Sequence, residues 1–264
     1  MTLDQFLELY DSNLKDCESP AYQVYWRASR PKFAVIVERL LARPPKRLLE
    51  IGTCIFSQQL RQLNPDWEIH TLDLTEGMRT VSEAAGVTFH QGDVLKPLPT
   101  PLDYFDTIIF SEVIEHLQGN PRLAFRHLRE ALCPGGQIIL TTPNLLRLAN
   151  RLKFMAGITP VERIGPPEQW AGHFREYSLA ELVDQCTQES LKSAVAQHSM
   201  HWESVELYLT SGARGFADAT GEFYYRPRFT GWKKPLGYLY GYTLTALAQK
   251  FPRLRHGLML VAER

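Results

Sequence analysis

Residues 47–52 read RLLEIG, a short apolar run that ends in glycine. The segment Arg47–Ile51 has the length and character of a buried strand, and Gly52 lets the backbone turn close to a ligand. Working outward, four more apolar segments indicate strands, each separated from the next by turn residues or a helical pattern. These segments are 67–73, 87–91, 104–110 and 137–142, the last preceded by a predicted turn at Pro134-Gly135-Gly136.

Helical periodicity alternates with these strands, for example at 56–63, 76–85 and 121–132. Such alternation predicts right-handed βαβ units and an α/β fold, with a mostly parallel central sheet covered by helices on both faces. We expect a single domain over residues 1–264. Its predicted parts are N-terminal helices at 1–44, a ligand-binding core at 45–142, inserted cap segments at 143–177 and 201–235, and a C-terminal helix and strand at 236–264.

The composition limits the kinds of partner that the protein can bind and the cellular compartment in which we expect it. The 264 residues include 29 basic and 29 acidic side chains, so the formal charge is zero, and nucleic acid is not expected as a partner. No two of the four cysteines form a Cys-x-x-Cys pair, which argues against a zinc clip. The first residues lack a basic n-region and no apolar run reaches membrane-spanning length. We therefore expect a cytoplasmic protein.

Parallel sheets of this type bind ligands at the carboxyl ends of their strands. That rule selects Gly52, Asp73, Asp93 and the pair Ser111-Glu112. Asp73 follows Gly52 by 21 residues and ends the second predicted strand, where an acid accepts hydrogen bonds from a ribose diol. Asp93 could hold an adenine amino group. The alternative is that both aspartates only cap turns or helices.

Several of these stretches together resemble one family. They are LLEIG (48–52), TLDL (71–74), QGD (91–93), YFDTIIFSEVIEHL (104–117), LCPGG (132–136) and TTPN (141–144). Over about residues 45–190 the chain is similar to the class I S-adenosylmethionine-dependent methyltransferases, which implies their Rossmann-like fold. The resemblance implies that S-adenosylmethionine is the cofactor. It places Glu50 and Gly52 at the methionine end, Asp73 with Leu74 at the ribose, Asp93 with Val94 at the adenine, and Ser111 nearby.

The first loop departs from the family pattern. The family reads Glu-x-Gly-x-Gly-x-Gly, whereas residues 50–56 read EIGTCIF, without the second and third glycines. Either side chains replace those glycines or the loop is two residues shorter. This departure leaves an alternative function open: a non-catalytic binding subunit, or a catalyst of another step such as cyclisation.

A second constellation contains Glu112, Glu115, His116 and the distant His173. On a helix the first three would share a face, and with His173 they could ligate Mg²⁺, Mn²⁺ or Zn²⁺. The arrangement resembles the site of the small-RNA 2′-O-methyltransferases and of the quinone-biosynthesis O-methyltransferases. Two alternatives stay open: His116 or His173 acts as a metal-free catalytic base, or both histidines are structural.

These features predict transfer of a methyl group to a hydroxyl of a small molecule, such as a sugar, a phenol or a quinone precursor. Aromatic residues of the cap could line an apolar pocket for it: Trp170, Phe174, Trp202, Tyr224, Tyr225 and Trp232. Residues 231–251 combine apolar and aromatic side chains with Lys233 and Lys234, which also suits peripheral contact with a membrane. The sequence leaves the oligomeric state open.

Overall fold

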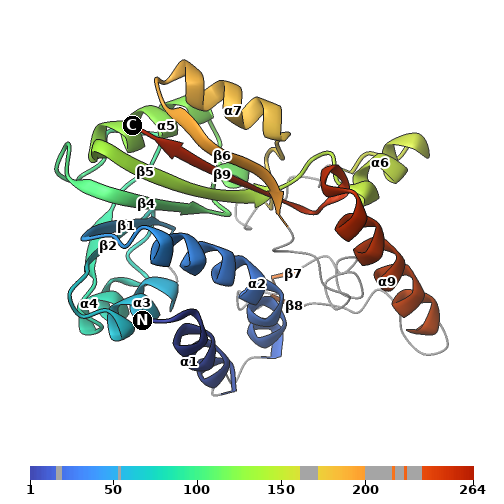
Figure 1. Cartoon of the computed structure of the whole chain (residues 1–264), viewed down its shortest axis with the longest axis horizontal. Helices are drawn as coiled ribbons and strands as arrows, with labels where there is room; N and C mark the ends of the chain where they lie inside the picture. The colour runs from blue at the N-terminus through green and yellow to red at the C-terminus, as the bar shows by residue number, and fades with distance from the viewer. Residues whose placement is uncertain (16–19, 53–54, 161–171, 200–215, 218–222, 225–233) are drawn as a thin grey trace.

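The computed structural model of this chain describes residues 1–15, 20–52, 55–160, 172–199, 216–217, 223–224 and 234–264. A seven-stranded sheet forms the centre of the molecule, in the order β3-β2-β1-β4-β5-β9-β6 (Figure 1). Its strands are β1 (Arg47–Ile51), β2 (Glu68–Asp73), β3 (Thr88–Gln91), β4 (Phe105–Ser111), β5 (Leu132–Pro143), β6 (Lys192–Ser199) and β9 (Gly257–Glu263). Strands β1 to β5 pair in parallel, whereas β9 is antiparallel to both of its neighbours. The predicted α/β fold with a mostly parallel sheet is confirmed.

Helices cover both faces of this sheet (Figure 1). One face carries α1 (Leu3–Lys15), α2 (Pro20–Ala42) and α3 (Ile55–Leu63), and the other carries α5 (Pro121–Ala131) and α7 (Leu179–Gln188). The remaining helices are α4 (Arg79–Ala84), α6 (Leu148–Met155), α9 (Lys234–Lys250) and the short 3₁₀ helices η1 (Ile114–His116) and η3 (Pro252–Leu254). Strands β7 (Phe216–Ala217) and β8 (Phe223–Tyr224) pair with each other as a separate antiparallel ribbon.

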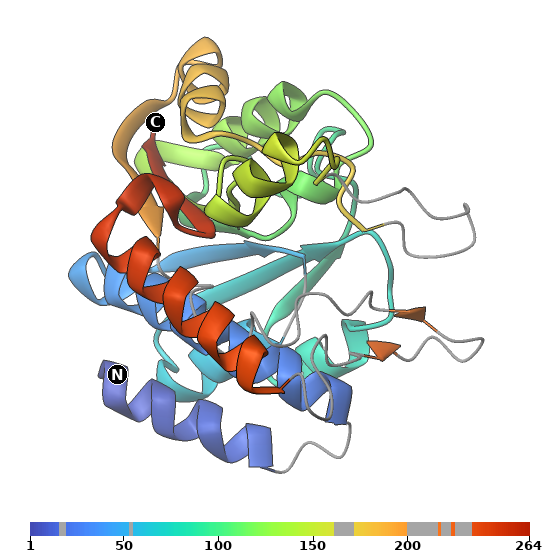
Figure 2. The ribbon, with the colours of Figure 1, turned by 90° about the vertical axis from the view of Figure 1, so that its right-hand side faces the viewer.

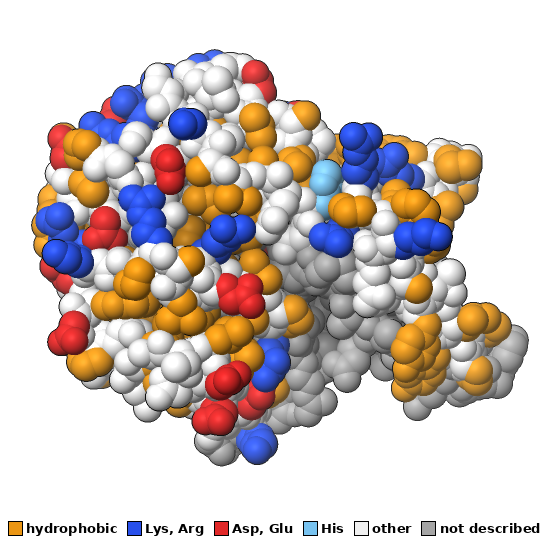
Figure 3. Space-filling model, in the orientation of Figure 1, with side chains coloured by type: hydrophobic (Ala, Val, Ile, Leu, Met, Phe, Trp, Pro, Cys, Tyr) orange, Lys and Arg blue, Asp and Glu red, His pale blue; other side chains and the backbone are white. Residues whose placement is uncertain are grey.

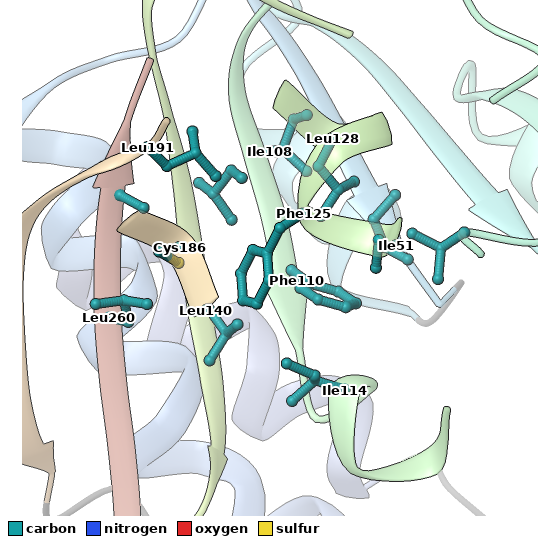
Figure 4. Close-up of a cluster of buried hydrophobic side chains, with 14 of the residues drawn as sticks. Ile51, Ile108, Phe110, Ile114, Phe125, Leu128, Leu140, Cys186, Leu191 and Leu260 are labelled. Atoms are coloured by element: carbon teal, nitrogen blue, oxygen red, sulfur yellow. The ribbon is translucent and has the colours of Figure 1, made fainter. Parts of the chain in front are cut away.

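Alternation along the central strands builds two cores from one sheet. Ile108 and Phe110 pack with Phe125 and the other apolar residues of α5 and α7 (Figure 4), whereas Ile109 packs toward α1, α2 and α3. Successive side chains of a strand point to opposite faces, so a strand buried on both faces is apolar throughout. This is why three consecutive residues of β4, Ile108, Ile109 and Phe110, are all apolar.

The structure corrects the prediction at Pro134-Gly135-Gly136, which we expected to be a turn. These residues lie inside β5, which begins at Leu132. The amide of Gly135 donates to the carbonyl of Arg264, and the amide of Arg264 donates to Gly136. Gly135 has a φ of +77°, and the register with β4 shifts nearby, so the glycines form an irregularity within the strand.

Two other elements differ from the predictions. Strand β6 was missed because it lies at the sheet edge and contains mainly Ala, Ser and Gln, with many exposed side chains. Helix α6 lies in the segment 143–177 that we expected to be irregular. Helix α2, one of the expected N-terminal helices, begins at Pro20 and contains Pro31. A capping box of Ser178 and Glu181 forms the start of α7.

A buried acid joins α5 to the end of α7. The carboxylate of Glu189 is 6% exposed and accepts from Arg122 at 2.7 Å and from Arg126 at 3.0 Å. The hydrogen bond from Arg126, with further help from Arg122, lowers the pKa of Glu189. We expect Glu189→Gln to lower the free energy of unfolding by about 1–2 kcal/mol at pH 7, since both arginines are partly screened by water.

Urea unfolding at several pH values checks this expectation. A lowered pKa in the folded state stabilises the protein above the unfolded-state pKa, and that contribution is lost as the pH falls through the folded-state pKa. The difference between wild type and Glu189→Gln should therefore shrink in acid. Glu83→Gln, which breaks an exposed pair on α4, is the matched control and should change stability little. An equal effect of both variants contradicts the assignment.

Candidate functional site

The carboxyl ends of four neighbouring strands form one continuous row. The amide of Gly92, after β3, donates to the carbonyl of Asp73 at 2.9 Å, and the amide of Gly52 donates to Leu72 at 2.9 Å. Beyond β1, Ser111 at the end of β4 contacts the hydroxyl of Thr141 in β5 at 2.8 Å. The chain leaves β1 toward β2 on one side and returns to β4 on the other, so the row spans the switch in strand order, where such sheets bind ligands.

Asp73 and Asp93 occupy the predicted places at two of these ends. The carboxylate oxygen Oδ1 of Asp73 accepts from the amide of Thr75 at 2.9 Å and from its hydroxyl at 3.1 Å. Asp93 accepts through Oδ1 from the amide of Leu95 at 2.9 Å. Each aspartate therefore also orders the turn that follows its strand. The turn role that we kept as an alternative is present, and both side chains stay partly exposed.

The other predicted cofactor residues differ in exposure. Leu74 is 64% exposed beside Asp73, whereas Val94 is 4% exposed and belongs to the core that α5 covers. Glu50 is buried, and its carboxylate accepts a hydrogen bond from the hydroxyl of Ser57 in α3. Glu50 thus ties β1 to the helix that follows it. A contact of Glu50 or Val94 with a cofactor stays a prediction.

Gly52 has a backbone conformation and close packing that residues with a side chain do not easily adopt. Its φ is +80°, a conformation that costs a residue with a Cβ roughly 1–2 kcal/mol. A Cβ at Gly52 would also lie 2.9 Å from Cγ2 of Val113, which follows β4. The ends of β1 and β4 therefore approach each other as closely as glycine allows.

We expect Gly52→Ala to destabilise the fold by about 2–4 kcal/mol, the sum of backbone strain and overpacking. Gly135→Ala is the matched control, because Gly135 has a φ of +77° but nothing within 4 Å of its Cβ position. It should cost only about 1–2 kcal/mol. Adding Val113→Ala to Gly52→Ala should recover part of the loss in urea unfolding. No recovery would mean that Val113 is not the obstacle.

The second constellation forms where η1 meets residues 172–177. The carbonyl of Glu115 accepts from the amides of Phe174 at 2.8 Å and Arg175 at 3.2 Å. Further along, the amide of Leu145 donates to the carbonyl of Tyr177 at 3.0 Å. These bonds hold the segment across the ends of β4 and β5. His173 is thereby brought to His116, and their ring centroids lie 5.0 Å apart at an angle of 71°.

Hydrogen bonds fix which nitrogen each histidine presents. Nδ1 of His116 lies 2.9 Å from the carbonyl oxygen of Gly172, which can only accept, so Nδ1 carries the proton. Nδ1 of His173 lies 3.2 Å from Oε1 of Glu176. Burial alone would raise the pKa of Glu176, but the bond from His173 and the nearby Arg147 lower it to about 2. Glu176 is therefore ionised and accepts, so Nδ1 of His173 also carries a proton, and in a neutral ring the lone pair would lie on Nε2.

Glu115 provides a buried carboxyl group beside these rings. It is 1% exposed, and its Oε2 accepts from the hydroxyl of Thr142 at 2.9 Å. Its Oε1 is buried without a hydrogen-bond partner among the described residues. Burial raises the pKa of Glu115 to about 8, and the charge of Glu112 adds to this, while His173 opposes it. Burial thus favours the protonated form of the Glu115 carboxyl.

Three of the four predicted metal ligands come together. The ligand atoms of Glu115, His116 and His173 all lie within 4.8 Å of one another. Ligands around a tetrahedral Zn²⁺ would be about 3.3 Å apart, so the group would have to contract slightly. Glu112 is not in the group and does not share a helical face with the others. It precedes η1 with a φ of +54°, and its amide donates to the carbonyl of Thr141.

Sequence reasoning missed the residues that support His173. Glu176 also accepts from Arg147 at 2.7 Å and from the side chain of Asn150 at 3.1 Å, so α6 and its preceding turn help to position the histidine. The spacing of His173 and Glu176, three residues apart, was the available signal. Arg147 and Asn150 gave none, because their segment was expected to be irregular.

Most of the aromatic residues that we expected to line a substrate pocket lie outside the described residues. Trp170, Trp202, Tyr225 and Trp232 lie outside the described residues, and for Tyr224 only the backbone, in β8, is described. Phe174 is half-buried beside the histidines. A cavity of about 420 Å³ does lie between α2 and the end of β6, but none of the predicted site residues lines it. The case for the site therefore rests on the strand ends.

Comparison with known proteins now identifies the family. Residues 25–194 match a family model described as a methyltransferase domain, which is more than half of the chain. The chain belongs to this family, and its fold is that of the class I S-adenosylmethionine-dependent methyltransferases. No curated protein matches the chain.

Solved structures share the fold at low identity. An S-adenosylmethionine-dependent methyltransferase from Mesorhizobium loti has 16% identity and a TM-score of 0.51, covering 86% of this chain and 96% of its own. The [4+2]-cyclase SpnF has 16% identity and a TM-score of 0.53, with 90% and 82% covered. The 1,6-didemethyltoxoflavin-N1-methyltransferase from Burkholderia thailandensis, solved with S-adenosylhomocysteine, has 12% identity and a TM-score of 0.50, with 90% and 78% covered.

Membership of the family implies that S-adenosylmethionine is the cofactor. The residues at the strand ends offer chemical groups that suit it. Asp73 offers a partly exposed carboxylate for the ribose hydroxyls, and Asp93 offers one for an amino group. Gly52 ends β1 in a left-handed conformation and has no side chain of its own to project toward a ligand. Residues 52–54 lie between the end of β1 and the start of α3.

Proposed function

We propose that this protein transfers the methyl group of S-adenosylmethionine to a hydroxyl group of a small molecule. The observation that carries the proposal is the position of His116 and His173, whose rings lie together near the carboxyl ends of β4 and β5 and are each held through Nδ1. A base in that place is what a hydroxyl acceptor requires, because the hydroxyl must lose its proton as the new bond forms.

When bound, the cofactor supplies an electrophilic methyl group on a positively charged sulfur. The chain holds the ribose through Asp73 and the adenine through the region of Asp93. Gly52 allows the cofactor to lie close to the backbone of β1. The protein thereby fixes the donor and leaves the acceptor to approach in line from the side of η1.

One of the two histidines takes the proton of the acceptor on Nε2. Glu176 holds His173 through Nδ1 and would stabilise the positive charge that the ring gains. Arg147 and Asn150 keep Glu176 in place, so the ring enters the reaction already oriented. The protonated Glu115 can donate a hydrogen bond to the acceptor oxygen.

A divalent metal held by Glu115, His116 and His173 is a second way to activate the acceptor. The observation that favours it is that each histidine ring is anchored through Nδ1, as metal-binding histidines usually are. Such an ion would bind the acceptor oxygen and lower its pKa. Glu115 would have to lose its proton to become a ligand.

Methyl transfer from isotope-labelled S-adenosylmethionine to sugars, phenols and quinone precursors tests the proposal. Each acceptor class is assayed after exhaustive chelation and again with Mg²⁺, Mn²⁺ or Zn²⁺ restored. We expect label in one acceptor class, together with stoichiometric S-adenosylhomocysteine. Activity that survives chelation assigns the histidines as bases, and activity that returns only with a metal assigns them as ligands.

The alternative functions, a non-catalytic binding subunit and a step such as cyclisation, keep one supporting observation. The connection between β1 and α3 is short, and the cyclase SpnF shows that this fold also occurs in a protein named for another reaction. Conversion of an acceptor without label or S-adenosylhomocysteine would favour a step such as cyclisation. Cofactor binding with no turnover in any class would favour the binding subunit.

A further inference from the structure

Exposed apolar side chains concentrate at one end of the molecule. Of the thirteen large apolar side chains exposed in the described part of the chain, ten lie in residues 146–158 or 236–251. These are α6, α9 and the residues next to them, and the most exposed include Phe154, Met155, Leu236, Leu239 and Tyr242. Soluble proteins rarely gather so much apolar surface without a partner. We call this the α6–α9 surface.

Two independent connections place these helices at the same end of the fold. Helix α6 follows the carboxyl end of β5, and α9 precedes β9, which runs antiparallel to β5 and begins at that same end. Figures 1 and 2 show both helices there, beyond the ends of the parallel strands. In Figure 3, hydrophobic side chains cover this part of the molecule, with Lys and Arg side chains beside them.

Helix α9 is apolar on two sides. Gly237, Gly241, Leu244 and Ala248 are buried, at the spacing of one helical face. Leu236, Leu239 and Tyr242 are 54%, 65% and 64% exposed on the other side. The buried face of α9 packs within the fold, whereas its second apolar face is exposed to solvent.

The charge of this surface has one sign. Residues 145–158 and 234–256 contain seven Lys and Arg and no Asp or Glu, so the rest of the neutral chain carries −7. Of these, Arg147 is paired with Glu176 in the site. A second copy of the chain bound through the same surface would oppose like charges. A surface that is both apolar and anionic matches it instead.

We propose that the α6–α9 surface binds the headgroup region of a membrane that contains anionic lipids, with Leu239, Tyr242, Phe154 and Met155 inserted at the interface. The charge asymmetry of the chain would turn this end toward such a membrane. No described helix has the length and hydropathy to cross a bilayer, so α6 and α9 lie along the surface. This proposal does not depend on the reaction that the protein catalyses.

Vesicle flotation tests the proposal with the full-length chain. Vesicles of phosphatidylcholine alone are compared with vesicles that also contain phosphatidylglycerol, at low and high salt. Wild type should float with the anionic vesicles, and high salt should weaken the binding. Arg151→Gln with Arg253→Gln should lower anionic binding by roughly 20-fold, about fivefold for each charge.

Met155→Glu with Leu239→Glu should lower binding at least tenfold on anionic vesicles, because insertion is lost. Leu102→Glu is the matched control, since Leu102 is 70% exposed but precedes β4, away from the α6–α9 surface. Its binding should stay at the wild-type level. Circular dichroism of each variant checks folding.

Two results would overturn the proposal. One is no binding of wild type to vesicles of either composition. The other is a dimer in light scattering that Met155→Glu with Leu239→Glu dissociates, without vesicle binding by the wild type, which would assign the surface to a second copy of the chain.

Discussion

Asp73→Ala is expected to weaken the binding of S-adenosylmethionine at least about 100-fold. The carboxylate at the end of β2 would accept two hydrogen bonds from the ribose diol, and bonds to a charged group contribute roughly 1.5–3 kcal/mol each. Their joint loss amounts to about 3–6 kcal/mol, and 1.4 kcal/mol changes a dissociation constant tenfold. Calorimetric titration of the purified variant measures the effect.

Two companion variants separate cofactor binding from the local turn. Asp73→Asn keeps an oxygen for the amide and hydroxyl of Thr75, so the turn should survive while affinity falls by a smaller factor. Asp66→Ala removes an exposed acid at the opposite end of the same strand and should bind normally. If Asp73→Ala binds as tightly as Asp66→Ala, the assignment of the ribose site is wrong.

His173→Asn is expected to lower turnover about 10²- to 10⁴-fold, the range typical for loss of a positioned base. The affinity for S-adenosylmethionine should change little, because the histidine acts on the acceptor. Glu176→Gln should lower turnover by a smaller factor of about 10–100, through loss of the orientation of His173. Initial rates with labelled cofactor, together with calorimetry, measure both quantities.

His198→Asn is the matched control for these variants. His198 lies near the end of β6 and lines the cavity next to α2, outside the candidate site. Its substitution should leave turnover within a factor of about two of the wild type. Full activity of both His173→Asn and His116→Asn would show that neither histidine is a base or a necessary ligand, and their role would then be structural.

The central sheet could be predicted closely from the sequence. Strand β1 has the predicted bounds, β2 and β3 each begin one residue later than predicted, and β4 is shifted by one residue at both ends. Strands buried on both faces consist of apolar residues throughout, and the segments between them have helical periodicity. The carboxyl ends then follow from the topology, which is why Gly52, Asp73 and Asp93 were found without a structure.

The support of the site could not be predicted in the same way. Glu176 is joined to Arg147 and Asn150 by contacts between segments that are more than twenty residues apart. No local pattern encodes such contacts. The left-handed backbone of Glu112 also escaped prediction, since a helical continuation from Ser111 to His116 is equally compatible with the sequence. The edge strand β6 lacked the apolar content by which strands are found.

The central claim is that the strand ends bind S-adenosylmethionine even though residues 50–56 lack the second and third glycines of the family pattern. Calorimetric titration of the wild-type protein with S-adenosylmethionine and S-adenosylhomocysteine tests it most directly. The account predicts binding of both ligands at micromolar concentration, with Asp73→Ala strongly impaired. Absence of binding at millimolar ligand, in protein shown to be folded, would contradict it.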